Sequence, residues 1–382
     1  MPLHFDEVEY AARRSRACSA LADANLDGIL LFAPESHFWL TGYDTFGFSM
    51  FQCMVLATDG RIHLLTRAPD LRQARHTSNL AEDHIHIWAE VEGASPAKDL
   101  ANLLAELNLS GKRIGVETKT AGLTAWNWDL VKQEIPGLIE ASDVIPSCRR
   151  LKSPAEIAMH RRAAALSDDA LDAAIAETRA GAFEGDVLAA MQGAVFKGGG
   201  DYAGNEFILG SAPGALLVRY YSGRRHLSPN DQMTLEWSGT YARYHAAMMR
   251  TLVVGKANDT QRRMHAACTE ALVACENAIK PAAAMGDVFK AHARVFDAHG
   301  FSHARLQACG YGMGVAYNPI WVEFPMFYSG NPLLIQANQV FFLHMILVDS
   351  ESGLAMCWGH SVLVTETAVQ RLSRHPLDLI EC

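Results

Sequence analysis

The chain has 382 residues, of which 49% are hydrophobic, and a formal net charge of -9. A chain of this length can bury a large core, and ordinary domain sizes favour two domains. The negative charge and the scattered Lys and Arg argue against binding to nucleic acid or to anionic membranes, because phosphate groups require clustered cations.

The first residues, MPLHFDEVEY, contain neither a basic n-region nor an apolar h-region. No run of about 18 apolar residues occurs either, so we expect a cytoplasmic protein without a membrane span. The eight cysteines show no CxxC pair and no Cys/His spacing of the zinc type, which indicates reduced, buried thiols.

Residues 1–150 alternate between helical and strand patterns and are predicted to form an α/β domain. Asp59-Gly60 is a hairpin signal because both residues tolerate positive φ. The predicted helices are Glu7–Ala24, Ala97–Leu107 and Leu123–Gln133. The predicted strands are Ile29–Ala33, Gln52–Thr58, Ile62–Thr66, His84–Ala89, Arg113–Glu117 and Leu138–Ala141.

The segment LKSPAE at 151–156 marks the predicted domain boundary. Ser153 is a good N-cap, Pro154 suits the first helical position, and Glu156 completes a capping box. The predicted helices that follow are 154–178, Asp186–Lys197, Asp259–Ile279 and Met285–His299. The predicted strands are Leu216–Tyr221, Thr234–Trp237, Tyr244–Val254, Val340–Leu347 and Ser361–Thr365. Residues 151–382 are therefore predicted to form an α+β domain.

The residues Asp231–Gly255 predict an antiparallel hairpin whose corner contains Ser238, Gly239 and Ala242. Glu236 stands at the end of its first, apolar strand. A buried carboxylate costs free energy unless it is paired, protonated or bound to a metal. Glu236 is therefore either a surface residue or part of a chemical site.

Four motifs, in order, resemble those of the creatinase, aminopeptidase P and prolidase family. LKSPAEIAMHRRAAALS resembles the entry to the catalytic domain, and SPNDQMTLEWSGTYARYHAAMMRTLVVG resembles the metal-binding hairpin. CGYGMGVAY resembles the glycine turn, and ANQVFFLHMIL with GHSVLVTE resembles the closing strands. The resemblance implies a pita-bread catalytic domain over 151–382, with helices covering a curved antiparallel sheet, and a smaller α/β domain over 1–150.

The resemblance also locates the positions of the family's metal ligands, which are two Asp, one His and two Glu. Those positions hold, in order, Glu236, Ala247, Tyr311, His344 and Gly359. Two divalent ions require bridging carboxylates, which one acid and one imidazole do not supply. We therefore expect no metal and no other cofactor. A single zinc ion held by Glu236, His344 and either His360 or His245 is the remaining metal alternative.

The chain is most similar to the metal-free branch of this fold, represented by creatinase and ectoine hydrolase. The resemblance to the ectoine hydrolase side rests on Glu236, on Tyr244-His245 without its acid, on Tyr311 in the glycine turn, and on Asn318–Trp321. Creatinase implies a Glu near 249 and a His near 219, where this chain has Met and Arg. A function taken from the fold is an analogy, so the substrate stays open.

Three residues are predicted to be catalytic. Glu236 acts as general base toward water or as nucleophile, and the pKa of a carboxylate buried beside Trp237 is expected to rise. His344 passes a proton to the leaving nitrogen. Tyr311, between glycines, donates to a developing oxyanion.

Seven further residues are predicted to bind substrate. Arg219, with Tyr220, ends a predicted strand and suits a substrate carboxylate through a bidentate pair. Three tryptophans are expected to form an aromatic box for a cationic group: Trp237, Trp321 and Trp358. The last two are His245 and His360.

These features predict a metal-independent hydrolase of an amide or amidine C–N bond in a small, carboxylated, nitrogenous metabolite. A metal-dependent Xaa-Pro peptidase and a catalytically inactive ligand-binding protein of this fold are the alternatives. The resemblance implies a homodimer, in which Tyr43–Phe51 is either a loop that reaches the partner's site or an ordinary surface loop.

Overall fold

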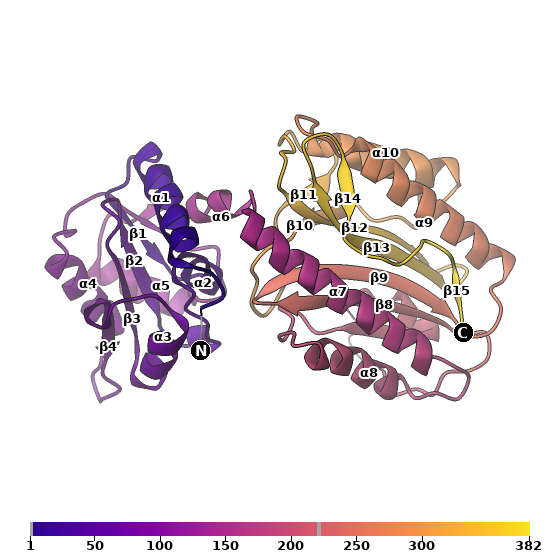
Figure 1. Ribbon diagram of the computed structural model, residues 1–382, viewed down its shortest axis with the longest axis horizontal. Helices are drawn as coiled ribbons and strands as arrows, with labels where there is room; N and C mark the ends of the chain where they lie inside the picture. The colour runs from indigo at the N-terminus through magenta and orange to yellow at the C-terminus, as the bar shows by residue number, and fades with distance from the viewer. Residues whose placement is uncertain (1–2, 220–222) are drawn as a thin grey trace. The chain divides into compact units, whose positions relative to one another are not determined.

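The computed structural model describes residues 3–219 and 223–382. Within these ranges the chain forms two compact units, which divide between Arg150 and Leu151. Each unit has its own sheet and its own hydrophobic core (Figure 1). No helix in these ranges combines the length and the apolar character that a membrane crossing requires.

In the described part of the first unit, six strands form a mixed sheet in the order β4-β3-β2-β1-β5-β6. β2 pairs antiparallel with β1 and β3, whereas β1 with β5 and β3 with β4 are parallel pairs. The strands are β1 (Gly28–Leu31), β2 (Cys53–Ala57), β3 (Ile62–Arg67), β4 (Ile85–Trp88), β5 (Ile114–Val116) and β6 (Ile139–Glu140). The α-helices are α1 (Glu7–Asp23), α2 (Pro34–Thr41), α3 (Leu71–Thr77), α4 (Pro96–Glu106), α5 (Ala125–Glu134) and α6 (Val144–Arg149). Short 3-10 helices lie at Gly47–Ser49, Ala68–Asp70 and Glu82–His84.

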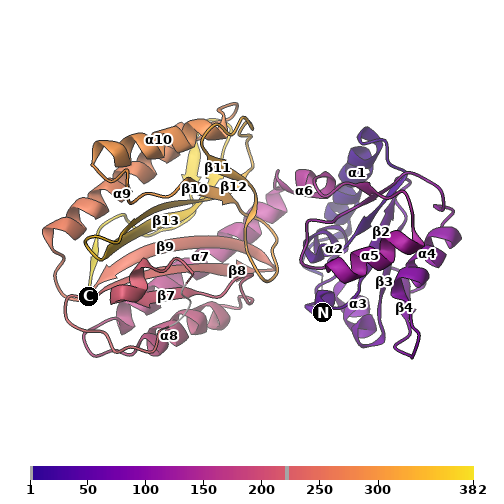
Figure 2. The same ribbon diagram turned by 180° about the vertical axis from the view of Figure 1, so that it is seen from behind.

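Helices cover both faces of this sheet. Successive residues of a strand point to opposite faces, so each buried strand supplies side chains to both helix layers. Ile29 and Leu31 pack in the core beneath α1, α2 and α6, and Leu30 packs in the core beneath α4 and α5. Figure 2 shows α5 and α4 crossing the strands on the side that faces the viewer. The α/β fold predicted for this region is confirmed.

In the second unit the described strands form a nine-stranded sheet, whose main path runs β11-β10-β12-β13-β9-β8-β7. The strands are β7 (Ile208–Ser211), β8 (Gln232–Tyr241), β9 (Tyr244–Val253), β10 (Ala308–Gly312), β11 (Glu323–Tyr328), β12 (Val340–Asp349), β13 (Leu354–Val364), β14 (Val369–Arg371) and β15 (Ile380–Glu381). The α-helices are α7 (Pro154–Glu177), α8 (Glu184–Lys197), α9 (Asp259–Ala278) and α10 (Met285–Ala298), and a 3-10 helix lies at Ala212–Leu216.

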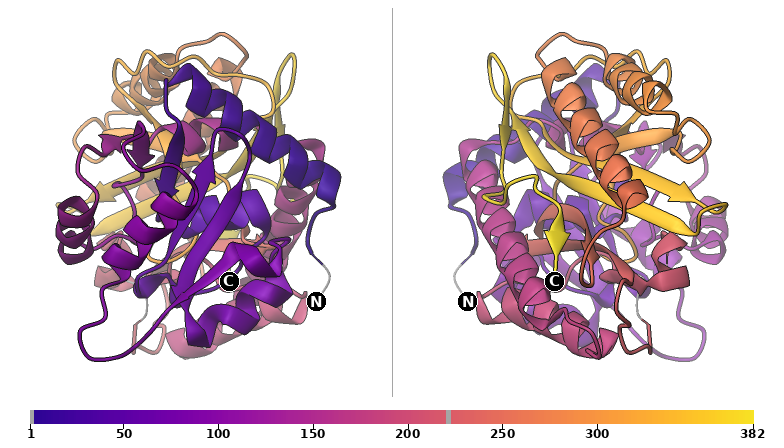
Figure 3. Two further views of the ribbon diagram at one scale, coloured as in Figure 1. Left: turned by 90° about the vertical axis from the view of Figure 1, so that its left-hand side faces the viewer. Right: turned by 90° about the vertical axis from the view of Figure 1, so that its right-hand side faces the viewer.

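The four helices of this unit cover one face of its sheet. Helix α7 packs on β8 and β9, and α8 packs on β7. Helix α9 packs on β12 and β13, and α10 packs on β10 and β11. The right-hand view of Figure 3 shows both helix pairs, in magenta and orange, in front of the sheet. The α+β fold predicted for this region is confirmed, and the opposite face of the sheet is left for the site described below.

Sequence patterns located the longer helices, but they missed the short helices α2, α3 and α6 and some strands. The capping box at Ser153 and Glu156 opens α7 as predicted. The predicted strand at 216–221 is wrong over its described residues, which form the end of a 3-10 helix and a turn. The first strand of the hairpin runs on through Ser238 and Gly239 to Tyr241, and the chain reverses at Ala242 and Arg243, which have positive φ.

A glycine is required at position 239 of this strand because α7 crosses the sheet there at short range. A Cβ atom at this position would lie 2.0 Å from the Ala163 carbonyl oxygen. The Ser167 hydroxyl of the same helix accepts a hydrogen bond from the Gly239 amide at 2.6 Å. The glycine that resembled a corner residue in the sequence is therefore a packing residue that fixes α7 on β8.

Candidate active site

The site begins with a row of residues that crosses four neighbouring strands. Glu236 in β8 pairs with Met249 in β9, Met249 pairs with Gly359 in β13, and Gly359 pairs with His344 in β12. Paired residues in a sheet point to the same face. Glu236 and His344 therefore stand on one face, separated by a methionine and by a glycine that adds no side chain.

This face holds a cavity of about 220 Å³. Apolar side chains make most of its wall, and the polar or charged lining residues among those described are few. The lining residues are Asn205, Val218, Arg219, Glu236, Met249, Leu306, Ala308, Tyr311, Ile320, Trp321, Val322, Met326, His344 and Ile346. A small apolar cavity with a few convergent polar groups is the usual form of a site for a small molecule.

Glu236 is the acid of this cavity and is partly exposed to it. Burial raises the pKa of its carboxyl from the ordinary value of 4.5 to about 7, although the Arg219 charge and the Tyr311 hydroxyl act in the opposite direction. The Tyr311 hydroxyl donates to Glu236 Oε1 at 3.5 Å, which is a long hydrogen bond. The carboxyl thus titrates near neutral pH and keeps most of its acceptor capacity for a ligand.

Tyr311 stands beside Glu236 at the junction of β10 with β12 and β11. The indole Nε1 of Trp321 donates to the Tyr311 hydroxyl oxygen at 2.9 Å. That contact occupies an acceptor site of the oxygen and leaves its proton directed toward Glu236 or a bound oxyanion. Burial and the Glu236 charge raise the pKa of Tyr311 well above 10, so the hydroxyl stays a donor.

His344 is the imidazole of the cavity, and its ring centroid lies 5.6 Å from that of Tyr311. Burial lowers its pKa to about 4, so the ring is neutral at pH 7. Its Nδ1 is buried and has no hydrogen-bond partner among the described residues. A neutral ring with an unused nitrogen can accept and release a proton.

Arg219 reaches the same cavity from the exposed segment that follows the 3-10 helix Ala212–Leu216. Its charge acts on both Glu236 and Tyr311, because it lowers the pKa of each. An exposed cation at the mouth of an apolar cavity suits a carboxylate at one end of a ligand. Tyr220, predicted beside it, lies outside the described residues.

The predicted aromatic box of three tryptophans is wrong for two of them, which lie on the helix-covered face of the sheet. Trp237 follows Glu236 directly and therefore points to the helix-covered face, where its Nε1 donates to the Ser167 carbonyl at 3.0 Å. Trp358 packs in the core beneath α9, with its ring 5.0 Å from the Arg250 guanidinium. Trp321 lines the cavity as predicted.

The two additional histidines also lie away from the cavity lining. His245 Nδ1 is 2.9 Å from the Arg243 carbonyl, and its Nε2 accepts from the Gly204 amide at 2.8 Å, so the backbone occupies both nitrogens. His360 Nε2 is 2.7 Å from Glu276 Oε1 on the helix-covered face, where Glu276 also binds Arg371. Both side chains are buried structural residues.

Several wall residues were not identified from the sequence. Strand alternation was a usable signal for Ile346, two residues after His344, and for Met249, which pairs with Glu236. Asn205 and Leu306 come from segments outside the strands, so no sequence period places them at the cavity.

The donor set does not fit the metal ions that the fold implies. At the positions of the family's metal ligands, Glu236 and His344 are the two side chains that offer a carboxylate or an imidazole. Ala247 and Gly359 carry no side-chain ligand atom, and the Tyr311 hydroxyl accepts a hydrogen bond from Trp321. Across residues 3–219 and 223–382, no cluster of three or more His, Cys, Asp or Glu is arranged to hold a metal ion. The zinc alternative also fails on geometry, since His245 and His360 are bound elsewhere.

Known proteins resemble this chain over its whole length. Residues 13–151 match the creatinase/prolidase N-terminal domain, and residues 158–366 match metallopeptidase family M24. Ectoine hydrolase of Halomonas elongata is 25% identical over 99% of this chain and 98% of its own length. Xaa-Pro dipeptidase of Pyrococcus furiosus is 22% identical over 65% of this chain and 70% of its own length. The crystal structure of dipeptidase PepE from Mycobacterium ulcerans superposes with a TM-score of 0.86 at 22% identity, covering 99% of each chain, which shows the shared fold.

Proposed function

We propose that this chain, which belongs to metallopeptidase family M24, is a hydrolase that breaks a C–N bond without a metal ion. The proposed bond is an amide or amidine in a small, carboxylated, nitrogenous metabolite. One observation carries the proposal: Glu236, which titrates near neutral pH, and the neutral His344 share an apolar cavity that lacks bridging carboxylates.

In the proposed reaction, the Glu236 carboxylate removes a proton from water while the water oxygen bonds to the carbon of the C–N bond. The electron pair of the adjacent C=O or C=N bond moves onto its heteroatom, which accepts a hydrogen bond from Tyr311. When the double bond forms again, the C–N bond breaks. The leaving nitrogen takes the proton that Glu236 gained, with His344 as relay, so one water is consumed.

The same geometry serves a second form of the reaction, in which a Glu236 oxygen bonds to the carbon and the C–N bond breaks. The leaving nitrogen takes a proton from water by way of His344, and the resulting hydroxide hydrolyses the mixed anhydride. In a single turnover in H₂¹⁸O, label in the Glu236 carboxylate identifies the nucleophile, because a general base places the label only in the product.

Two observations support the substrate class. Arg219 supplies a cation at the cavity mouth, and apolar residues such as Val218 and Ile320 surround the remaining volume of about 220 Å³. A ligand with one carboxylate and a compact body matches both features. The similarity to ectoine hydrolase along 99% of this chain agrees with a small metabolite rather than a peptide.

The test is a hydrolysis screen with chelator-treated protein. Cyclic amidines and N-acyl amino acids are the proposed substrates, and Xaa-Pro dipeptides with and without Mn²⁺ test the peptidase alternative. We expect release of amine or ring opening in the first set at undiminished rate in chelator. Turnover of Xaa-Pro dipeptides that requires Mn²⁺ would overturn the proposal, and binding without turnover of any compound would favour an inactive ligand-binding protein.

The proposal includes a homodimer, as the resemblance to the family implies, and a location in the cytoplasm. In the segment Tyr43–Phe51, the Phe46 side chain is exposed and a 3-10 helix forms at Gly47–Ser49. An exposed aromatic residue on a short, structured loop suits contact with a second subunit.

A further inference from the structure

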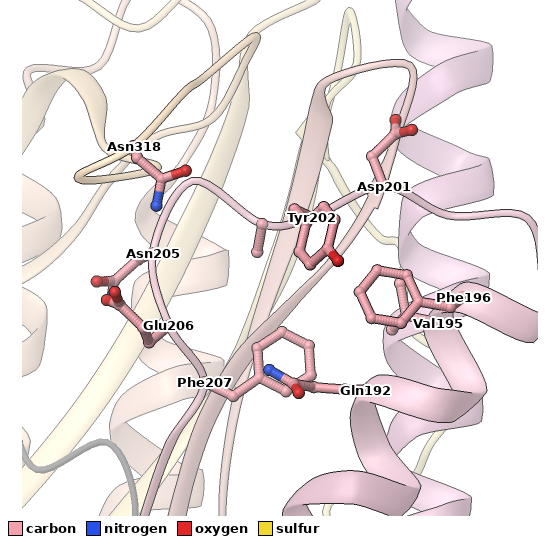
Figure 4. Close-up of a pocket in the computed structure, with 10 residues that line it drawn as sticks. Gln192, Val195, Phe196, Asp201, Tyr202, Asn205, Glu206, Phe207 and Asn318 are labelled. Carbon is pink, nitrogen blue, oxygen red and sulfur yellow. The ribbon is translucent and has the colours of Figure 1, made fainter. Parts of the chain in front are cut away.

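A second cavity of about 220 Å³ lies between α8 and the segment 201–207 of the same unit (Figure 4). Its lining residues are Gln192, Val195, Phe196, Asp201, Tyr202, Ala203, Asn205, Glu206, Phe207 and Asn318. Figure 4 shows Phe196 and Tyr202 close together on one side of it, with Asn205 and Glu206 on the other. The proposed reaction makes no use of this cavity.

The aromatic side of the cavity is open to solvent. Tyr202 is 75% exposed and Phe196 is 41% exposed, and their ring centroids lie 4.9 Å apart in an edge-to-face arrangement. Adjacent exposed aromatic rings are a common feature of binding surfaces, because their apolar faces gain by being covered. Their π-electron faces also attract cations.

The charged residues of the lining are both acids. Asp201 accepts a hydrogen bond from the Arg243 amide at 3.1 Å, so part of its carboxylate is engaged in holding the loop. Glu206 is exposed, and it has no hydrogen bond or ion pair with the described residues. No Lys or Arg belongs to the described lining. The cavity therefore combines an available negative charge with an aromatic wall, which suits an organic cation.

Asn205 lines this cavity and also the cavity that contains Glu236. The residue before it, Gly204, is fixed by its amide, which donates to His245 Nε2 at 2.8 Å. Gly204 also packs closely on the segment that carries Trp321, since an added Cβ atom would lie 2.9 Å from the Ile320 carbonyl oxygen. The segment 201–207 is thus a wall shared by the two cavities, and it is held in place at Gly204.

We propose that the second cavity is a binding site for small organic ammonium ions. The ammonium group lies near Glu206 and the apolar body covers Phe196 and Tyr202. Because Asn205 borders both cavities, an occupant is expected to stiffen the wall and to alter the cavity on its other side. This inference stands on the cavity itself and does not depend on the proposed reaction.

The test measures the affinity of the full chain for 3-phenylpropylammonium and for its neutral counterpart 3-phenylpropan-1-ol by titration calorimetry. We expect the ammonium ion to bind at least fivefold more tightly than the alcohol. Glu206→Gln should remove this preference, Phe196→Ser should weaken both compounds at least threefold, and Glu366→Gln, at an exposed acid outside the lining, should change neither. Equal affinity for the two compounds, or an unchanged preference in Glu206→Gln, would overturn the site.

Hydrogen–deuterium exchange tests the coupling to the other cavity. Saturation with 3-phenylpropylammonium should slow exchange at 203–207, which lines the second cavity, and also at 321–326, which includes lining residues of the Glu236 cavity and none of the second. Asn205→Ala should reduce the effect at 321–326. Slower exchange confined to 192–207 would show binding without coupling and would overturn that part of the inference.

Discussion

Two glutamates, one in each unit, have a similarly raised pKa and opposite surroundings. Burial raises the pKa of Glu117 to about 7, as it does for Glu236. The carboxylate of Glu117 accepts from the Ala33 amide at 3.1 Å and from the Ser36 hydroxyl at 2.6 Å. Glu236 has one long contact of 3.5 Å and faces a cavity.

The difference shows that a shifted pKa does not by itself identify a functional acid. Glu117 uses its oxygens to join β5 to the start of α2, and Arg149 binds the same Ser36 hydroxyl at 2.9 Å. Among the described residues the Glu236 side chain makes no other hydrogen bond, so its oxygens stay available to a ligand. Available acceptor atoms beside an open cavity, rather than the pKa, distinguish the proposed catalytic acid.

The largest expected effect is on turnover. Glu236→Gln removes the base and should lower kcat by about 10³-fold or more, within the range that a positioned general base contributes. The matched variant Glu117→Gln, which changes an acid of the same pKa, should keep kcat within about twofold because it touches no cavity residue. Both kcat values are measured with the substrate found in the screen. Comparable losses of kcat in both variants would show that Glu236 is not distinguished from Glu117 as the catalytic acid.

The reverse order is expected for stability. Glu117→Ala leaves the Ala33 amide and the Ser36 hydroxyl without their acceptor and should cost about 2–4 kcal/mol of unfolding free energy. Glu236→Ala breaks one long hydrogen bond and should lower the unfolding free energy by less than about 1 kcal/mol. Urea unfolding of both variants at one pH measures this difference, and a larger loss for Glu236→Ala would show that Glu236 is structural.

The pH dependence of stability gives an effect of intermediate size. An acid whose pKa is 4.5 unfolded and about 7 folded favours the folded state fully below pH 4.5, and that contribution is lost as pH rises through 7. The loss for Glu236 is at most about 3 kcal/mol. Glu236→Gln should therefore become more stable relative to wild type between pH 4.5 and pH 8. A constant difference across that range would mean that the pKa of Glu236 is not raised.

The smallest expected effect comes from Arg219, which is exposed. Arg219→Met removes a cation that lowers the pKa of Glu236, so the activity limb assigned to Glu236 should move to higher pH by less than about one pH unit. The KM for a carboxylated substrate should rise about tenfold, and that for its amide counterpart should not. An equal rise in both KM values would exclude Arg219 as the carboxylate anchor.

The parts of the fold that short sequence motifs determine were predicted correctly. The capping box at Ser153 and Glu156 and the hairpin at Asp59-Gly60 are signals within a few residues, and both lie where predicted. The strand predicted at 216–221 was wrong over its described residues, 216–219, because an apolar stretch alone does not distinguish a strand from a turn that packs on a cavity.

Site residues were predicted correctly where the alternation of a strand places them, and incorrectly where tertiary packing places them. Glu236, Tyr311, His344 and Trp321 meet at one cavity, as expected. The prediction that Trp237 lines the cavity overlooked strand alternation: it directly follows Glu236, and neighbouring strand residues point to opposite faces. The burial of His245 under Gly204 depends on how a distant loop folds over the hairpin, and no sequence pattern carries that information.

The most direct test is the pH profile of kcat/KM for chelator-treated wild-type protein. If Glu236 is the catalytic base, activity should rise with pH through a pKa near 7, where the carboxyl loses its proton, and chelator should leave the profile unchanged. A profile that collapses on chelation and returns with Mn²⁺, or that shows no ascending limb between pH 5 and pH 8, would contradict the account.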